Sequence, residues 1–313
     1  MKATARAYPV QGLIKHHMLF DNRIRLPFHD LISVCTAPLC TVTTFAFQEE
    51  KEVAIKGESP DFDTVSRIDS VVSEIRRLSG VDEEYKMVSE NNFPSMGLGA
   101  SSGFAALAVA AAKAAGLDLS HKELSRIAKK GAGSASESVT GWFSRWRSNI
   151  EEQFCYSFVI EDDLEMGMVA ALVEPFEYMD ELRKKVLTSS LFEYRLKTIH
   201  TRLYNMERAI KDHDVSKIGR LAEEDTLIVH ALTMTGNKEM VWGPDILRVM
   251  AEVKALREEG VEAYFSIDTG AVVYMNSYPE DVAVITERIN ALGVKTIQLS
   301  VGGEAHVIRE HLF

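Results

Sequence analysis

A loop rich in glycine and serine leads directly into an alanine-rich segment, and this stretch, residues 91–116, most constrains the fold. Gly97 and Gly99 lack a Cβ atom, so the backbone N–H groups around them can approach an anion closely. Ser101 and Ser102 add hydroxyl groups where the helix that follows would present its free N–H donors and the positive end of its dipole. The stretch is typical of a phosphate-binding loop on a buried helix, although the same residues also suit an ordinary helix N-cap.

Composition and charge restrict the classes of protein to which the chain can belong. Its 313 residues are enough for a sizeable core and predict two lobes. The net charge of −11 argues against a nucleic-acid-binding protein, which needs a basic surface, so an anionic ligand would require a local cationic pocket. Lys113 interrupts the longest alanine-rich run, so no membrane span is expected. The N-terminus lacks an apolar signal core and the three cysteines lack zinc-like spacing, so we expect a cytoplasmic protein without a metal.

Hydrophobic periodicity predicts a mixture of strands and helices. Short runs rich in Thr, Val and Phe fill the first 47 residues and are typical of strands and hairpins. Helices are expected where apolar residues recur every three or four positions, and Ser120 and Glu123 form a capping box at the start of one of them. The expected helical ranges are 61–79, 104–115, 120–131, 186–212, 218–234 and 245–258, and the last expected strand is 295–301.

Basic side chains gather near the N-terminus of this otherwise acidic chain. The group consists of Lys15, His16, His17, Arg23, Arg25 and His29. Any one of them alone is typical of a solvated loop. The group becomes a candidate anion-binding pocket only together with the resemblance described below.

Two further stretches carry candidate site residues. Residues 131–143 combine small side chains with several hydroxyl groups, a pattern more typical of a tight turn than of a site. Near the C-terminus, two strand-like runs flank an Asp-Thr-Gly sequence that begins at Asp268. This sequence is typical of a hairpin turn, and it also places a carboxylate at a strand end. Asp-Thr-Gly also occurs in aspartic proteases, but the chain has no second such motif to supply the partner Asp.

These motifs together resemble the GHMP kinase superfamily and, within it, the mevalonate diphosphate decarboxylase branch. The loop segment reads Asn-Asn-Phe-Pro, then Ser-Ser and Gly-Phe-Ala-Ala-Leu. The N-terminal segment, with Gln-Gly-Leu-Ile-Lys-His and later Arg-Leu-Pro-Phe-His-Asp, is similar to the signature of archaeal phosphomevalonate decarboxylases. The resemblance covers nearly the whole chain and implies an α+β, GHMP-kinase-like two-lobe fold. It implies an N-terminal lobe like domain 2 of ribosomal protein S5 over residues 1–175 and a ferredoxin-like α/β lobe over residues 176–313.

The resemblance also implies roles for individual residues. Asp268 corresponds to the catalytic carboxylate, which acts either as a base for the 3-hydroxyl group or as a charge that stabilises a developing cation. Lys15 corresponds to an active-site lysine, which would keep Asp268 ionised from within hydrogen-bond or one-water reach and contact a substrate anion. The residues expected to bind substrate or phosphate are Ser101, Ser102, Ser134, Ser136, Arg25 and Thr269, and Gly97 and Gly99 belong to a degenerate nucleotide loop.

The chain departs from the family pattern at two places that concern ATP. Glu137 stands where the pattern Gly-Ser-Gly-Ser-Ala-Cys-Arg-Ser has an Arg that binds the substrate carboxylate or phosphate. We expect Glu137 to form a local ion pair with Arg145, Arg147 or the N-terminal basic group, so that Glu137→Gln changes activity less than tenfold. The loop between Pro94 and the Gly-Phe pair has eight residues where ATP-using relatives have about ten, which is too short to wrap a triphosphate in the same way.

Within the family, these departures favour an ATP-independent mevalonate 3,5-bisphosphate decarboxylase that releases isopentenyl phosphate, CO₂ and phosphate and needs no cofactor. One alternative is a decarboxylase that uses ATP and Mg²⁺ on phosphomevalonate or diphosphomevalonate. Another is a non-catalytic protein of the same fold. The expected partner is a small phosphorylated mevalonate, with neither nucleic acid nor a membrane, and the resemblance leaves a homodimer open.

Overall fold

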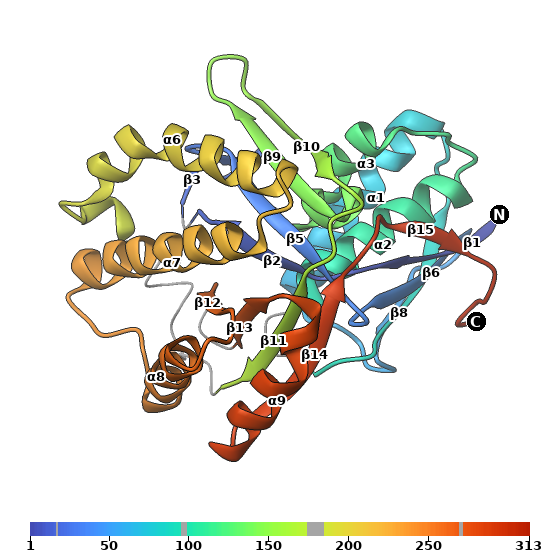
Figure 1. Cartoon of the computed structure of the whole chain (residues 1–313). Coiled ribbons are helices and arrows are strands. Elements are labelled where there is room, and N and C mark those ends of the chain that lie inside the picture. Colours follow the sequence, from blue (N-terminus) through green and yellow to red (C-terminus); the bar gives the residue numbers. More distant parts are fainter. Residues whose placement is uncertain (17, 95–98, 174–184, 269–271) are drawn as a thin grey trace.

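The computed structural model describes residues 1–16, 18–94, 99–173, 185–268 and 272–313. Two large β-sheets, with helices packed on them, build the fold, which is therefore α+β as the resemblance implied (Figure 1). Among the described helices, none has the length and apolar character that crossing a bilayer requires.

A five-stranded sheet forms one end of the molecule. In spatial order its strands are β15 (His306–Ile308), β1 (Lys2–Ala7), β6 (Thr41–Gln48), β8 (Glu84–Asn91) and β7 (Glu52–Ile55). β15 is the last strand of the chain and pairs antiparallel with β1. The N- and C-terminal segments therefore lie side by side (Figure 1).

Helix α2 (Gly99–Ala114) fills the core against this sheet. From Ala105 onward its alanines are almost completely buried, and β1 contributes Ala3, Ala5 and Ala7 to the same core. Small residues on both elements allow the helix and the strand to pack closely. The helices around α2 are α1 (Phe62–Ser79), α3 (His121–Ala128) and α4 (Ala135–Thr140).

An eight-stranded sheet links the two halves of the chain. Its order is β10 (Phe154–Glu161), β9 (Phe143–Asn149), β5 (Leu31–Ala37), β14 (Lys295–Val301), β11 (Gly167–Leu172), β13 (Val272–Ser277) and β12 (Ala263–Ile267), with β2 (Val10–Ile14) paired to β5. β14 pairs with both β5 and β11, so the sheet continues from one predicted lobe into the other. The predicted boundary at 175/176 lies outside the described residues.

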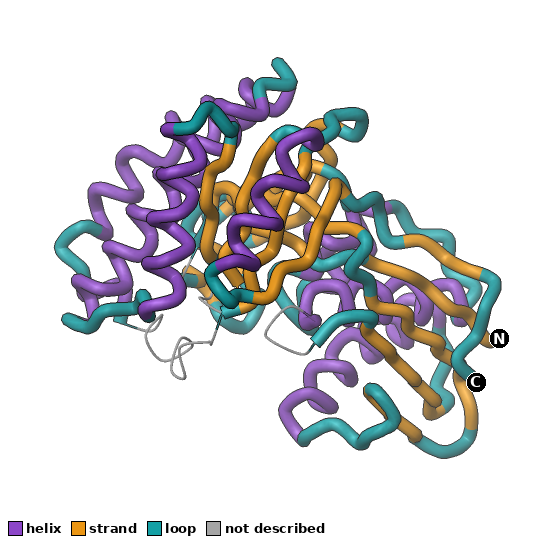
Figure 2. Tube along the Cα trace, turned by 60° about the horizontal axis from the view of Figure 1, so that its bottom comes forward, coloured by secondary structure: helices purple, strands orange, loops and turns teal. Residues whose placement is uncertain are grey.

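Helices cover both faces of the C-terminal end of this sheet (Figure 2). The helices are α6 (Phe192–Lys211) and α7 (Val215–Asn237) on one face, and α8 (Pro244–Glu258) and α9 (Val282–Ala291) on the other. β13 shows the two-residue period of a strand: Val272 and Tyr274 pack with α6 and α7, whereas Val273 and Met275 pack with α8 and α9. The remaining elements are β3 (Leu19–Asp21), β4 (Leu26–Pro27) and the short 3₁₀ segments η1 (Val186–Thr188) and η2 (Pro279–Asp281).

Candidate active site

Lys15 and Asp268 meet at Gly12, although they come from opposite ends of the chain. Lys15 directly follows β2, and Asp268 directly follows β12. The amide N–H of Gly12 donates a hydrogen bond to Oδ2 of Asp268 at 3.1 Å. A Cβ atom on Gly12 would lie 2.9 Å from Oδ1 of Asp268 and 3.0 Å from Cγ of Lys15. Both side chains therefore pack directly against the bare Cα atom, and the structure brings the two predicted catalytic residues together.

The alternation of side chains along β12 explains why Asp268 faces this point. Phe265 and Ile267 pack into the core formed with α8 and α9. Ser266 lies on the opposite face, where its hydroxyl group accepts from Nζ of Lys15 at 2.9 Å and donates to the carbonyl oxygen of Gly12 at 3.2 Å. Asp268 is two residues beyond Ser266, so the strand period directs it to the same face.

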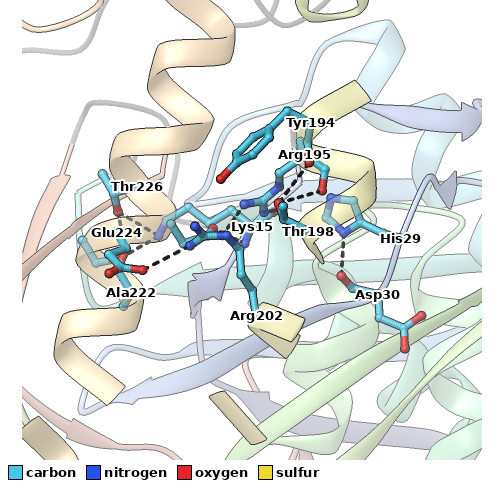
Figure 3. A network of polar contacts seen from close by, with 12 residues as sticks. Lys15, His29, Asp30, Tyr194, Arg195, Thr198, Arg202, Ala222, Glu224 and Thr226 are labelled. Atoms are coloured by element: carbon cyan, nitrogen blue, oxygen red, sulfur yellow. Dashed lines mark hydrogen bonds and ion pairs between the residues drawn. The ribbon is translucent and has the colours of Figure 1, made fainter. Parts of the chain in front are cut away.

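Lys15 is buried, and its ammonium group lies between α7 and β12. Besides the bond to Ser266, Nζ donates to Oγ1 of Thr226 at 3.0 Å, and Figure 3 shows the side chain extending toward this residue of α7. Burial lowers the pKa of Lys15, while the negative charges of Asp268 and Asp225 act in the opposite direction. An ammonium group has three N–H donors, and Thr226 and Ser266 accept two of them among the described residues.

A buried ion pair supports the backbone at Lys15. Asp225 of α7 accepts the amide N–H of Lys15 at 2.8 Å, and Arg195 of α6 donates to the carbonyl oxygen of Lys15 at 2.7 Å. Arg195 and Asp225 also form an ion pair with each other. Burial alone would raise the pKa of Asp225, but the charges of Arg195 and Lys15 lower it below its usual value. The two helices thus fix the position of Lys15 through both its N–H and its C=O group.

A narrow cleft borders this network. Its wall combines Lys15 and Arg195 with apolar side chains, including Phe28 and Phe192. His29 also lines the cleft, and burial together with the charge of Arg195 lowers its pKa to about 3, so its imidazole is neutral. The cleft therefore combines two buried cations with an apolar surface.

Glu137 reaches the same neighbourhood from α4. Its side chain is buried, and burial raises the pKa of Glu137 to about 8, with a further contribution from the charge of Asp268. A hydrogen bond with Ser33 of β5 acts in the opposite direction. The carboxyl group is therefore protonated at neutral pH.

The ion pair expected for Glu137 is wrong, so the small effect that it predicted for Glu137→Gln loses its basis. Arg145 instead binds Asp30 and Glu207, and within the described part of the chain no cation pairs with Glu137. The pairing of β5 with β9 gives the reason, because Ser33 lies opposite Ser144, and the neighbouring Arg145 points to the other face of the sheet.

Two of the predicted phosphate-binding serines form hydrogen bonds with other hydroxyl groups in the protein interior. Oγ of Ser102 lies 2.6 Å from Oγ1 of Thr41, and Oγ of Ser136 lies 2.8 Å from Oγ of Ser157. Both serines are completely buried. Neither contact involves Lys15, so their part in binding phosphate stays a prediction.

The other predicted binding residues occupy different places. Ser101 is buried in the first turn of α2, and Ser134 is the N-cap residue of α4 without a side-chain capping bond. Arg25 donates to the carbonyl oxygen of Lys130, and burial and Arg67 lower its pKa. The contacts of Arg25 do not connect it to the Lys15 network. Gly99 is the first residue of α2, while Gly97 and Thr269 lie outside the described residues.

Four residues of the network were not singled out from the sequence: Arg195, Asp225, Thr226 and Ser266. Ser266 carries a signal, because it precedes Asp268 by two positions in a strand and so shares its face. The other three lie in helices whose amphipathic pattern indicates core packing, and periodicity alone cannot show that a buried position carries a charge.

One group of side chains among the described residues has the proximity of metal ligands. It consists of Glu161, Asp163 and His213, which lie near the surface at the end of β10 and after α6. His213 is within ion-pair distance of both acids, at 3.6 and 3.2 Å. The group shares no residue with the Lys15 network.

Comparison with known proteins places the whole chain in one family. Residues 7–157 match the model of the diphosphomevalonate decarboxylase-like N-terminal domain, and residues 179–292 match the mevalonate 5-diphosphate decarboxylase C-terminal domain. A phosphomevalonate decarboxylase of Haloferax volcanii is 43% identical over 99% of this chain and 98% of its own length. A diphosphomevalonate decarboxylase of Candida albicans is 28% identical over 83% of this chain and 80% of its own length.

Solved structures agree with this placement. The mevalonate diphosphate decarboxylase of Staphylococcus aureus superposes with a TM-score of 0.90 at 25% identity, covering 98% of both chains. A mevalonate-3-kinase of Thermoplasma acidophilum shares the fold, with a TM-score of 0.85 at 18% identity and 99% of both chains covered. The predicted GHMP-kinase-like fold is thereby confirmed. The chain belongs to the mevalonate phosphate decarboxylase family of the GHMP kinase superfamily and is a carboxy-lyase.

Proposed function

We propose that the protein decarboxylates mevalonate 3,5-bisphosphate without a nucleotide, giving isopentenyl phosphate, CO₂ and phosphate. Family membership supports a phosphorylated mevalonate as the substrate. The observation that carries the finer proposal is Glu137, because a buried carboxyl group lies beside Asp268 where the family pattern has an Arg. A carboxyl group cannot hold the substrate carboxylate or phosphate as that Arg does, so the site differs from that of the ATP-using relatives, and the shortened loop before α2 supports the same conclusion.

The geometry at Gly12 suits a reaction in which positive charge develops on the substrate. As the tertiary C3–O bond breaks, the carboxylate of Asp268 would stabilise the cation-like carbon. The third donor of Lys15 would hold an anionic group of the substrate, while Thr226 and Ser266 fix the other two. The electron pair of the bond to the substrate carboxylate then forms the alkene, and CO₂ leaves.

A second candidate is ATP-dependent decarboxylation of 5-phosphomevalonate. The name and 43% identity of the Haloferax volcanii relative favour it. In that reaction Asp268 would first accept the proton of the 3-hydroxyl group while ATP phosphorylates it. Both candidates release isopentenyl phosphate, so the product alone does not distinguish them.

Product analysis with and without Mg-ATP separates the candidates. We expect purified protein to form isopentenyl phosphate and CO₂ from mevalonate 3,5-bisphosphate in the absence of nucleotide, and calorimetry to detect no micromolar affinity for Mg-ATP. Asp268→Asn serves as the inactive control. Turnover of 5-phosphomevalonate only with Mg-ATP, together with an inert bisphosphate, would establish the second candidate.

The same proposal includes a cytoplasmic homodimer, since homodimers are common among relatives of this kind. Sedimentation equilibrium would give twice the chain mass of 34.9 kDa for a dimer and the single mass for a monomer.

A further inference from the structure

Glu137 is a buried acid on which the charge of Asp268 acts, and among the described residues it has no cation as a partner. It lies in α4 and is 3% exposed. Its Oε1 atom has no hydrogen-bond partner among the residues that the structure describes. A buried carboxyl oxygen without a partner costs about 1–3 kcal/mol, so an arrangement of this kind calls for an explanation.

The groups around Glu137 leave it in the neutral form. Ser33 and Cys35 face it from β5, and Asp268 faces it from the end of β12. Burial raises the pKa of the Cys35 thiol, so Cys35 supplies no charge at neutral pH. Asp268 bears the only charge that acts on the carboxyl group of Glu137 among the described neighbours, and this charge keeps the proton on Glu137.

Departure of a tertiary phosphate requires a proton. A phosphate ester that leaves as its dianionic form would produce a fully ionised phosphate, which is a very poor leaving group. A proton transferred to it during bond cleavage yields hydrogen phosphate and lowers the barrier, and general acid catalysis of this kind typically contributes about 10²- to 10⁴-fold in rate.

We propose that Glu137 is a catalytic acid, which donates its proton to the 3-phosphate as the C3–O bond of the substrate breaks. This inference rests on the proposed function, in which a phosphate leaves C3. The C3–O bond breaks with its electron pair going to the phosphate, which takes the proton of Glu137 and departs as hydrogen phosphate. The bond between C2 and the carboxylate then breaks, its electron pair forms the C2–C3 double bond, and CO₂ is released. Water reprotonates Glu137 after the products leave.

The two carboxyl groups thereby have different tasks. Asp268 accepts the Gly12 N–H and interacts electrostatically with the charge of Lys15, and both effects favour an anion. Within the described ranges, Glu137 has neither a cation nor a partner for Oε1. Two carboxyl groups in one site, one ionised and one neutral, supply the negative charge and the proton that this reaction needs.

Kinetics at several pH values test the assignment. For the wild type, kcat on mevalonate 3,5-bisphosphate should fall as the pH rises through about 8, because the proton of Glu137 is then lost. Glu137→Gln, which keeps shape and neutrality but has no acidic proton, should lower kcat on the order of 10²-fold or more with little change in KM, and the alkaline decline should disappear. Glu137→Asp should recover part of kcat and retain the decline.

Ser33→Ala distinguishes a catalytic role of Glu137 from a purely structural one, because only a catalytic role links the pKa of Glu137 to the pH dependence of kcat. The hydrogen bond with Ser33 lowers the pKa of Glu137, so its removal should move the alkaline decline to higher pH. Glu137→Gln activity within tenfold of the wild type, or an alkaline decline that persists in this variant, would overturn the proposal.

Failure of the proposed function has a different signature. It would appear as a wild-type protein that turns over 5-phosphomevalonate only with Mg-ATP. The same phosphate must then leave C3 after its transfer, so the Glu137→Gln and Ser33→Ala profiles measured with Mg-ATP test the catalytic acid independently. Circular dichroism melts confirm that each variant is folded.

Discussion

The negative charge of Asp268 is the residue-scale feature on which the proposed chemistry depends most. Asp268→Asn keeps the size of the side chain and removes the charge that would stabilise a cation-like transition state. We expect turnover to fall on the order of 10²- to 10³-fold, about 3–4 kcal/mol, with little change in substrate affinity. Steady-state kinetics measure both quantities, with the exposed Asp118→Asn as the control. Near-normal turnover of the variant would mean that the Asp-Thr-Gly sequence forms a hairpin turn without a catalytic role.

Gly12 allows the two candidate catalytic side chains to approach each other. In Gly12→Ala the new Cβ atom would meet Asp268 at 2.9 Å and Lys15 at 3.0 Å, so the carboxylate has to move. Because displacements of this size at a reacting group are costly, we expect kcat to fall roughly 10- to 100-fold in an otherwise folded protein.

Gly243→Ala is the matched control for that change. No heavy atom lies within 4 Å of a Cβ built on Gly243, which is the N-cap residue of α8. If both alanine variants retain full kcat, close packing at Gly12 is irrelevant to the chemistry.

At the scale of elements, α6 and α7 hold Lys15 through the buried pair of Arg195 and Asp225. Arg195→Met leaves Asp225 buried without its partner, which typically costs 3–5 kcal/mol. Urea unfolding should show this loss at pH 7. Arg208→Met removes an exposed pair with Asp212 from the same helix and should cost less than about 1 kcal/mol.

The pH dependence of the Arg195 variant provides a second check. The pKa of Asp225 is lowered in the folded protein, so its contribution to stability is present at neutral pH and is lost as the pH falls through that value. The gap in unfolding free energy between wild type and Arg195→Met should therefore narrow in acid. This account of the Arg195–Asp225 pair would be contradicted if the difference in unfolding free energy were the same at all pH values. It would also be contradicted if the difference were as small as that for Arg208→Met.

Local sequence signals predicted several of these elements well. Helix α1 begins after Asp61, which caps the N–H of Thr64, and ends at Gly80 with φ of 76°. The capping box of Ser120 and Glu123 is also confirmed. Each of these features depends on residues within one turn of a helix, and such signals can be read directly from the sequence.

Elements and contacts that depend on tertiary structure were harder to predict. Helix α9 was not predicted, and α4 forms where small residues suggested a turn. The predicted ion pair of Glu137 required knowledge of which face of β9 carries Arg145, and this follows from strand register rather than from proximity in sequence. The clustering of Lys15 with Asp268 could be predicted because the family resemblance supplied a long-range contact that periodicity does not contain.

At the scale of the whole molecule, the continuous sheet from β10 to β12 brings both halves of the chain to one site. β2 carries Gly12 and is directly followed by Lys15, β5 carries Ser33, and Asp268 directly follows β12. Because β14 lies between β5 and β11, the C-terminal strands are fixed against the N-terminal ones by backbone hydrogen bonds. The site therefore depends on folding of the whole chain, and stability and activity should respond together to groups buried within it.

The link between stability and activity can be measured at Glu137. Its pKa is raised from an ordinary value of 4.5 to about 8 in the folded protein, so the folded state holds the proton more tightly than the unfolded chain. The resulting stability is fully present below about pH 4.5 and is lost as the pH rises to about 8, at up to about 1.4 kcal/mol per pH unit. Gln cannot titrate, so between pH 5 and 8 the unfolding free energy of the wild type should decrease relative to that of Glu137→Gln. Urea denaturation at several pH values measures the difference, and Glu151→Gln controls for the loss of an exposed carboxylate. A wild-type curve parallel to that of Glu137→Gln would mean that Glu137 is ionised in the folded protein and cannot act as the acid.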